Sequence, residues 1–531
     1  MSEVAVATTS PLAAEAALAV IEDGGNAVDA AVAASMASTN TQPGVCALAG
    51  GGYAVVWPPD GDPVTIDGYV EMPGRGLAAD ALGRGGIRVA MDYGGGLETV
   101  IGPGSVAVPG TPAALAEASR RYGRLPWAAL MEPSIRAARE GFPLASACHH
   151  YLEYSGDVVF SRSPDSRAAI HDDQGRLLAP GDTVRVPHLA DSLELIAREG
   201  VQAFYEGELA QAIVQHVRAG EGALTLADMA AYRPILRPAL TIRTGGWDIA
   251  TNPPPAIGGA VLGAMLEQLD HEALDGWTEE TVARLIAAMH GALTWRRERL
   301  DLAEDPAAEG EALLAAARRG ELGGLPALRE SGSTVHTSAV DAQGLACAIT
   351  ISSGYGSGEM PPGTGLWLNN CLGEIELNRR GLVCGPPGTR LPSNMAPTTA
   401  RSDGRVLAIG TPGAGRITTA LCQVLVNFFR LGMGLDAAVA HPRLHVQIRD
   451  DGDRVACEPG LPMPEGGLPV RTFDGLSMYF GGVGAVLHDE RRGFEIAADP
   501  RRAGGVCLGR ASPLATPPAT DSGPAAGDAA E

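Results

Sequence analysis

The 531-residue sequence predicts an α+β protein built as a layered sandwich, and three observations favour that class. Apolar residues at helical spacing dominate the first two-thirds of the chain, and strand-like runs mixed with helices follow. Glycine is abundant, at 70 residues, and marks turns along the chain without a collagen-like period. A hydrophobic content of 45% is typical of a folded protein that buries a sizeable core.

The charge and the apolar pattern restrict the classes of partner. A formal net charge of −22 argues against nucleic acid, because phosphates attract basic surfaces. No charge-free apolar stretch of about 20 residues is present, so we expect no membrane span. The first residues lack the basic and apolar regions of a secretory signal, which predicts a cytoplasmic protein. A small-molecule substrate, with no nucleic-acid or membrane partner, is therefore expected.

The metal-binding residue types do not cluster in this sequence. The eight cysteines are scattered without a Cys-x-x-Cys pair, which argues against a zinc ribbon or a compact disulfide framework. The histidines do not recur at metal-ligand spacing. We expect reduced thiols, no metal and no cofactor.

Helices are expected to make up most of the first 300 residues. A helix over 11–23 ends at two glycines, and Asn26 opens a second helix to about Ser38. Asp29 in that helix is either a capping residue, which we favour, or a buried one beside the glycines. Strands are expected at 50–57 and 65–70, and further helices at 112–121, 137–141, 203–218, 260–269 and 281–301.

A β-hairpin is expected where the polar segment 301–332 ends. Strand-like runs at 337–340 and 345–352 flank a glycine-containing turn at 341–344. Thr334 stands just before the first run, where a nucleophile at the start of a central strand would lie. An ordinary strand-edge threonine fits the same pattern. His336 shares a face with Thr334 by alternation and is expected to support the site, since no Gly-x-Ser-x-Gly elbow indicates a serine triad.

The last third combines short strands with a glycine-rich loop. Strands are expected at 366–370 and 406–409, with a loop at 391–398 between them. The loop Gly410–Arg416 precedes a helix to about Arg430, but it lacks the lysine and hydroxyl residue of a phosphate loop. Its backbone N–H groups suit an oxyanion hole, and a plain tight turn is the alternative.

Together these segments resemble the γ-glutamyltranspeptidase family of N-terminal-nucleophile hydrolases, from about residue 4 to 505. The segments that carry the resemblance are Gly24–Ala30, Val108–Thr111, Ala203–Gly207, Pro253–Pro255, Asn369-Asn370 and Asp499–Arg502, with a processing motif at Thr334, His336, Ser338 and Asp341.

The resemblance implies a four-layer αββα sandwich assembled from two subunits of one autoprocessed precursor. Cleavage between Ser333 and Thr334 is expected to produce subunits 1–333 and 334–531, which stay together as a heterodimer. Further oligomerisation is left open. Residues 510–531, rich in Ala, Pro, Gly, Ser and Asp, are expected to form a disordered tail.

The resemblance also implies a catalytic set. Once freed, the Thr334 α-amine, with a pKa of roughly 7.7–8.0, serves as base for its own hydroxyl. The backbone N–H groups of Gly413 and Ala414 correspond to the oxyanion donors. Ser352 corresponds to an assisting hydroxyl that is usually a threonine, and Asn370 to a supporting amide.

The residues implied for substrate binding match the family less well. Arg75 corresponds to the arginine that holds a glutamyl α-carboxylate, and Glu374 to an acid that holds the α-amine. Cys371 stands where glutamine or glutamate is usual, and Ser393-Asn394 replaces a Ser-Ser pair. An asparagine expected after the second hydroxyl is missing.

The catalytic residues match the family's pattern and the binding residues depart from it, and this combination leaves three functions open. The first is an acyltransferase or hydrolase that cleaves a γ-glutamyl or related small carboxylate-bearing acyl group through an acyl-enzyme on Thr334. The second is a homologue for a non-glutamyl substrate, by oxamate-type amide hydrolysis or by oxalyl carbon–carbon cleavage in natural-product biosynthesis. The third is an inactive homologue that binds a small acid. Hydrolysis that depends on Thr334 separates the first two from the third.

Overall fold

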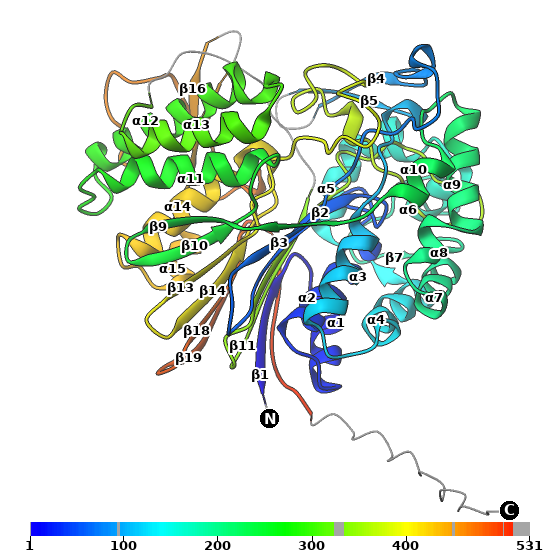
Figure 1. Ribbon diagram of the computed structural model, residues 1–531, viewed down its shortest axis with the longest axis horizontal. Coiled ribbons are helices and arrows are strands. Elements are labelled where there is room, and N and C mark those ends of the chain that lie inside the picture. Colours follow the sequence, from blue (N-terminus) through cyan, green and yellow to red (C-terminus); the bar gives the residue numbers. More distant parts are fainter. Residues whose placement is uncertain (1, 93–95, 323–333, 449–451, 503, 513–531) are drawn as a thin grey trace, which may run out of the picture.

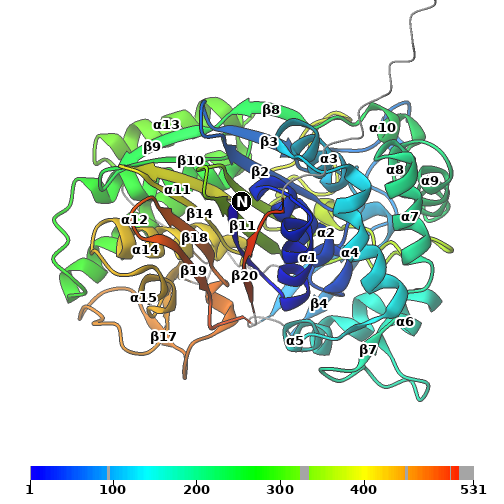
Figure 2. The ribbon, with the colours of Figure 1, turned by 90° about the horizontal axis from the view of Figure 1, so that it is seen from below.

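Two β-sheets lie face to face and helices cover the outer side of each (Figures 1 and 2). The computed structural model describes residues 2–92, 96–322, 334–448, 452–502 and 504–512. The order of layers is therefore helices, sheet, sheet, helices, as the sequence analysis expected.

The first sheet has seven strands in the order β20-β1-β11-β12-β2-β3-β8. Their bounds are β1 (Glu3–Thr8), β2 (Gly51–Trp57), β3 (Val64–Gly68), β8 (Ile235–Pro238), β11 (Val335–Asp341), β12 (Ala346–Ser352) and β20 (Gly505–Arg510). The second sheet has six strands in the order β19-β18-β14-β13-β10-β9. Their bounds are β9 (Leu240–Thr244), β10 (Trp247–Thr251), β13 (Thr398–Ser402), β14 (Arg405–Gly410), β18 (Gly484–Asp489) and β19 (Gly493–Ala498).

Three small sheets lie outside this pair. They contain β4 (Ile87–Met91) with β5 (Leu97–Ile101), β6 (Phe142–Pro143) with β7 (Thr183–Val184), and β15 (Leu444–Gln447) with β16 (Arg454–Cys457) and β17 (Val470–Thr472).

Helices on the first side come from the N-terminal half of the chain (Figure 1). They are α1 (Pro11–Glu22), α2 (Ala27–Thr41), α3 (Thr111–Tyr122), α4 (Trp127–Glu140), α5 (Ser146–Ser155), α6 (Pro164–Ile170), α7 (Leu189–Glu199), α8 (Gln202–Tyr205), α9 (Glu208–Ala219) and α10 (Leu226–Ala231). The helices on the side of the second sheet are α11 (Ile257–Asp270), α12 (Glu279–Glu298), α13 (Pro306–Arg318), α14 (Ile417–Phe429) and α15 (Leu435–Ala440).

Local capping explains where the first two helices begin. Ser10 accepts a hydrogen bond from the Ala13 N–H at 3.2 Å, and Pro11 occupies the first turn of α1. Asn26 and Asp29 form a capping box at the start of α2. Asp29 is also fully buried, and it accepts hydrogen bonds from the Arg124 N–H. The two roles considered for Asp29 are thus both confirmed.

Three sequence expectations need correction. The first two-thirds of the chain carries helices α1 to α13, as expected, but it also contributes strands β1 to β12, more than the sequence predicted. Residues 366–370 do not form a strand, because only a single bridge joins Leu368 to Ala49. The side-chain amide of Asn369 donates hydrogen bonds to the Ala49 and Ala107 carbonyls instead. The tail does not begin at 510, since Arg510 ends β20 opposite Glu3, while 513–531 lie outside the described residues.

Both sheets interleave strands from before and after Thr334. In the first sheet β11 pairs with β1, and β12 pairs with β2. In the second sheet β13 pairs with β10. A cut before Thr334 would therefore leave the two pieces joined by backbone hydrogen bonds in both sheets.

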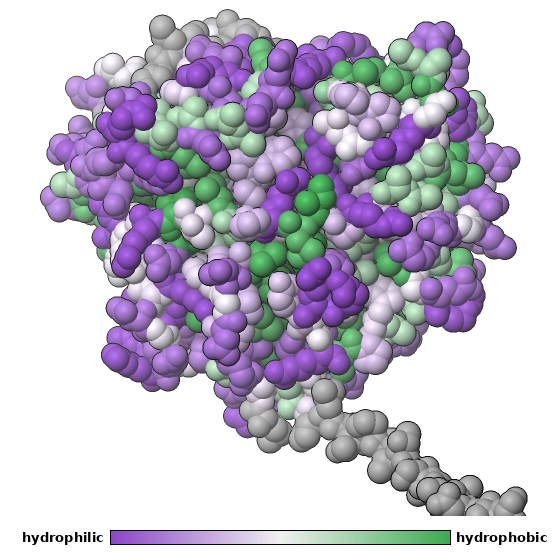
Figure 3. Space-filling view, viewed as in Figure 1, coloured by the Kyte–Doolittle hydropathy of each residue, from purple (hydrophilic) through white to green (hydrophobic). Residues whose placement is uncertain are grey.

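Small side chains let the two sheets approach each other closely. The core between them consists of Ala5, Ala7, Val340, Ala346, Ala348, Ala408 and Val486. The two larger cores lie between each sheet and its helices. The face in Figure 3 is mostly hydrophilic, with a group of hydrophobic side chains near its middle. On β8, Ile235 and Leu236 are exposed hydrophobic residues. Among the described residues, no helix has the length and apolar character needed to cross a membrane.

Candidate active site

The strand register brings two hydroxyl residues opposite each other at one end of β11. Val335 pairs with Ile351 and His336 with Thr350, so the next position outward sets Thr334 opposite Ser352. Ser352 in turn pairs with Gly51 of β2. Thr334 is 2% exposed and Ser352 is also buried, while Ser333 lies outside the described residues. The predicted nucleophile and assisting hydroxyl thus come from neighbouring strands.

His336 is held at both ring nitrogens beside this pair. Its Nε2 lies 2.7 Å from the Ser338 Oγ, and its Nδ1 lies 2.8 Å from the Thr350 Oγ1. Because Ser338 donates its own proton to the Gly484 carbonyl, the Ser338 oxygen must accept from Nε2–H, and Nδ1 accepts from Thr350. Burial lowers the pKa of His336 from 6.5 to about 3. The imidazole is therefore neutral and fully engaged, as expected for a supporting residue.

The loop Gly410–Arg416, which we call the oxyanion loop, starts at the same end of the sheet sandwich. A side chain on Gly410 would run into the His336 ring, so the two residues are in direct contact across the sheets. Gly413 and Ala414 have positive φ angles of 140° and 49°. No described residue accepts a hydrogen bond from either of their N–H groups. Helix α14 begins directly after the loop, so its positive end faces the same region.

A chain of polar side chains forms a wall next to Ser352. Ser352 accepts a hydrogen bond from the Gly354 N–H at 3.1 Å, and a Cβ on Gly354 would lie 3.2 Å from the Glu374 carboxyl carbon. Glu374 interacts with the Cys371 thiol, which interacts with the Tyr69 hydroxyl. Burial, followed by the nearby Glu376, raises the pKa of Glu374 well above its usual range. Its Oε2 is buried without a hydrogen-bond partner.

Asn370 supports the turn that carries Ser352. Its Oδ1 accepts from the Tyr355 N–H at 2.6 Å, and its amide donates to the Thr99 hydroxyl and the Val100 carbonyl. Ser393 and Asn394 are both buried, and they pack against the first turn of α11. The Ser393 carbonyl accepts hydrogen bonds from the Ile257 and Gly258 N–H groups there. The Asn394 Oδ1 has no hydrogen-bond partner among the described residues.

The ion pairs of Arg75 are made with residues other than these groups. Its guanidinium is 3.7 Å from Glu71 and 3.7 Å from Asp228, and its side chain is 38% exposed. Both distances are too long for hydrogen bonds, and the Arg75 Nε has no hydrogen-bond partner among the described residues. Arg75 is thus charge-compensated while its N–H groups are still able to bind an anion.

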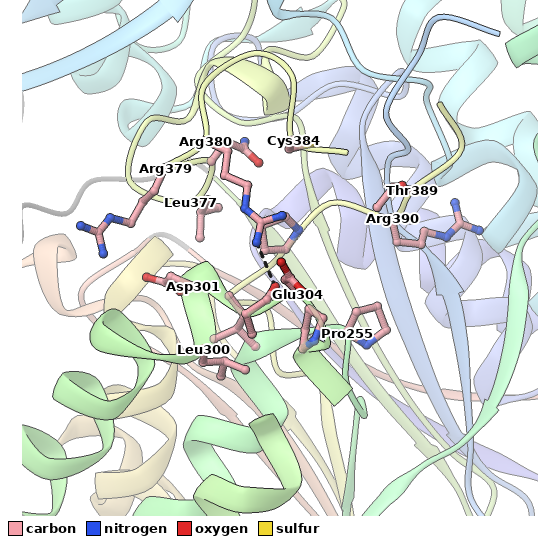
Figure 4. Close-up of a pocket in the computed structure, with 15 residues that line it drawn as sticks. Pro255, Leu300, Asp301, Glu304, Leu377, Arg379, Arg380, Cys384, Thr389 and Arg390 are labelled. Atoms are coloured by element: carbon pink, nitrogen blue, oxygen red, sulfur yellow. Dashed lines mark hydrogen bonds between the residues drawn. The ribbon is translucent and has the colours of Figure 1, made fainter. Parts of the chain in front are cut away.

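A cavity of about 120 Å³ adjoins the site through Asn378 (Figure 4). The Asn378 amide donates to the Cys371 carbonyl. Arg380 points into the cavity and donates to the Leu302 carbonyl, whereas Arg379 points away. Thr334 does not line this cavity. Across the described ranges, no cluster of three His, Cys, Asp or Glu side chains could hold a metal ion.

Sequence reasoning missed three residues that the fold brings to the site. Thr350 bonds to His336 and could have been found, because alternation places it on the face of Ser352. Tyr53 and Tyr69 stack at 5.6 Å between ring centres beside Cys371. They come from β2 and from just after β3, and no local pattern predicts their contact.

The buried neutral His336 predicts a specific loss of stability in acid. The unfolded chain takes up a proton near pH 6.5 while the folded chain resists it down to about pH 3. The free energy of unfolding should therefore fall by about 1.4 kcal/mol per pH unit as pH decreases through that window. Urea unfolding of uncut Thr334→Ala, with and without His336→Gln, measures this. The glutamine variant should lose the extra slope, and parallel pH profiles would contradict the assignment.

Comparison with known proteins gives a consistent family. A family model described as gamma-glutamyltranspeptidase matches residues 13–508. The acylase ACY 1 proenzyme of Pseudomonas sp. (strain V22) is 32% identical over 474 residues, covering 83% of this chain and 82% of that protein. The glutathione hydrolase proenzyme of Escherichia coli (strain K12) is 30% identical over 485 residues, covering 85% and 82%. The crystal structure of cephalosporin acylase from Bacillus halodurans superposes with a TM-score of 0.80 at 27% identity, covering 95% and 96%.

Proposed function

Because this chain belongs to the gamma-glutamyltranspeptidase family and is a hydrolase or γ-glutamyltransferase-like enzyme, we propose that Thr334 is its nucleophile. The precursor cuts itself before Thr334, and the two pieces, 1–333 and 334–531, act as one α/β heterodimer. The enzyme cleaves a γ-glutamyl or related small carboxylate-bearing acyl group. We also propose a cytoplasmic location.

The observation that carries this proposal is the meeting of two elements at one end of the sandwich. Thr334 lies one residue before β11, and the oxyanion loop begins where β14 ends. The contact between His336 and Gly410 ties these two ends together. The N–H groups of Gly413 and Ala414, which donate to no described residue, are the kind of donors that an acyl-transfer site needs.

The reaction then proceeds in two acyl transfers. The free α-amine of Thr334 takes the hydroxyl proton while the oxygen attacks the acyl carbon, and Ser352 hydrogen-bonds to the attacking oxygen. The N–H groups of Gly413 and Ala414 stabilise the negative oxygen of the tetrahedral intermediate. The leaving amine departs with the proton, and water or an acceptor amine releases the acyl group from Thr334.

The binding groups divide by charge. Arg75 is the residue we assign to a substrate carboxylate and Glu374 to a substrate ammonium, with Cys371, Ser393 and Asn394 as the polar lining. The unpartnered Oε2 of Glu374 supports this role, since an incoming ammonium would supply the missing hydrogen bond and favour ionisation.

The proposed function is tested by mass and by hydrolysis. The purified protein should separate into fragments 1–333 and 334–531, and it should release p-nitroaniline from γ-glutamyl-p-nitroanilide. A cut chain that leaves this substrate intact would reject the γ-glutamyl assignment alone. An uncut, inactive chain would reject the nucleophile as well.

Glu374→Gln should raise KM for this substrate by about 10- to 100-fold, because the amide keeps the shape of the carboxyl but cannot pair with the ammonium. We expect kcat to change by no more than about threefold, since Glu374 does not contact the attacked carbonyl. Initial rates over a range of substrate concentrations measure both constants. Glu359→Gln, which removes the charge of another buried carboxyl paired with His216 at 2.7 Å, is the control and should leave KM unchanged. An unchanged KM in Glu374→Gln would exclude the ammonium role.

A further inference from the structure

The oxyanion loop rests on residues 477–483, which we call the platform. The Gly482 N–H donates to the Thr411 Oγ1 at 2.9 Å. Across the same boundary, a Cβ on Gly413 would lie 3.2 Å from the Gly481 Cα. The loop thus contacts the platform at Thr411, near its start, and at Gly413, one of the two residues whose N–H groups we assign to the oxyanion.

The platform is itself anchored by buried charges. The Arg443 guanidinium donates to the Phe480 carbonyl at 3.0 Å and pairs with Asp499 at 2.7 Å. Asp499 accepts from the Val483 N–H at 2.8 Å and also pairs with Arg501. A buried, mutually bonded set of this kind is rigid, because each group loses its partner if any one moves.

Arg416 joins the end of the oxyanion loop to this platform. Its Nε donates to the Tyr479 carbonyl at 3.0 Å, and its guanidinium lies 4.5 Å from the centre of the Tyr479 ring. The side chain is buried, and no described carboxylate lies within ion-pair distance. A buried cation without an acidic partner is costly, so stability alone does not account for an arginine here.

The backbone next to Arg416 needs such support. Ala414 has a left-handed φ of 49°, a conformation that a residue with a side chain adopts at a cost. The N–H direction of Gly413 and Ala414 depends on keeping it. We propose that Arg416 is a positioning residue that holds these two N–H groups toward the oxyanion by binding the Tyr479 carbonyl and ring. The inference rests on the proposed function, which makes the two N–H groups the oxyanion donors.

Two substitutions at Arg416 separate geometry from charge. Arg416→Lys keeps the positive charge but loses the planar guanidinium, which stacks on the ring and donates to the carbonyl. Arg416→Met loses the charge as well as the guanidinium. We expect each to lower kcat by about 10- to 100-fold with KM changed less than about threefold, because small misplacements of catalytic groups act on the transition state. Arg401→Lys is the matched control, since Arg401 also lies over a ring, that of Trp57 at 5.0 Å, and donates to carbonyls elsewhere.

A substrate-independent readout accompanies the kinetics. A small fluorophosphonate should phosphonylate the processed protein, the Thr334 oxygen bonding to phosphorus as fluoride leaves and the proton passes to the α-amine. The mass of the 334–531 fragment follows the rate, which should drop in both Arg416 variants and not in Arg401→Lys. This readout tests the inference even if the γ-glutamyl substrate proves wrong.

Thr411→Val provides a second variant, because it removes the other link from loop to platform without touching Arg416. It should also lower kcat and the labelling rate, with KM little changed. Processed Arg416→Lys that matches wild type in both rates would overturn the inference, as would activity in Arg416→Lys together with its loss in Arg416→Met. If the wild-type chain stays uncut, the proposed role of the two N–H groups as oxyanion donors is rejected, and the inference about Arg416 is rejected with it.

Discussion

Thr334→Ala is expected to remain a single uncut chain of 531 residues and to lose hydrolysis by a factor on the order of 10⁴ or more. The alanine has no oxygen to attack its own preceding peptide bond, and later no nucleophile for substrate. The wild-type protein should meanwhile split before Thr334. Intact mass and hydrolysis of γ-glutamyl-p-nitroanilide, measured side by side after incubation, report both effects.

Thr337→Ala is the matched control for this experiment. Thr337 is another buried threonine, within β11, and its hydroxyl bonds to the Thr8 hydroxyl at 3.0 Å. Losing that bond should cost about 1 kcal/mol and leave cleavage intact. Cleavage and turnover that persist in Thr334→Ala would show that another residue is the nucleophile.

Gly410→Ala is expected to give the second large effect, through a single added methyl group. Its Cβ would lie 2.5 Å from the His336 Nδ1 and 2.7 Å from Nε2. The ring is unable to turn away without breaking its bonds to Thr350 and Ser338. We expect a loss of about 3 kcal/mol in the free energy of unfolding. Displacement of β11 against the oxyanion loop should also slow appearance of the 334–531 fragment by about 100-fold.

Urea unfolding and timed mass spectra measure these two effects. Gly434→Ala is the control, since Gly434 has a φ of −60° and no atom within 4 Å of an added Cβ, so it should change stability by less than about 0.5 kcal/mol. The double variant Gly410→Ala, His336→Ala should cost less than the sum of its parts, because removing the ring makes room for the methyl group. Strict additivity would mean that the two residues do not clash.

The stretch around Thr334 shows what local sequence determines. Alternation alone predicts the hairpin and puts Thr334 and His336 on one face of β11, because side chains of a strand repeat every two residues. Capping is equally local, so Asn26 and Asp29 predict the start of α2. These signals involve residues within a few positions of each other.

The surroundings of Thr334 were decided by tertiary structure. His336 meets Gly410 across two sheets, and Tyr69, Cys371 and Glu374 meet although some 300 residues separate the tyrosine from the thiol. The expected strand at 366–370 is replaced by a single bridge at Leu368, beside which the Asn369 side chain donates to the Ala49 and Ala107 carbonyls from distant segments. Local periodicity reports which face a side chain takes and holds no information on what packs against that face. Thus the sequence by itself determined the hairpin and the threonine at its start, and only the packing of the two sheets decided which groups surround that threonine.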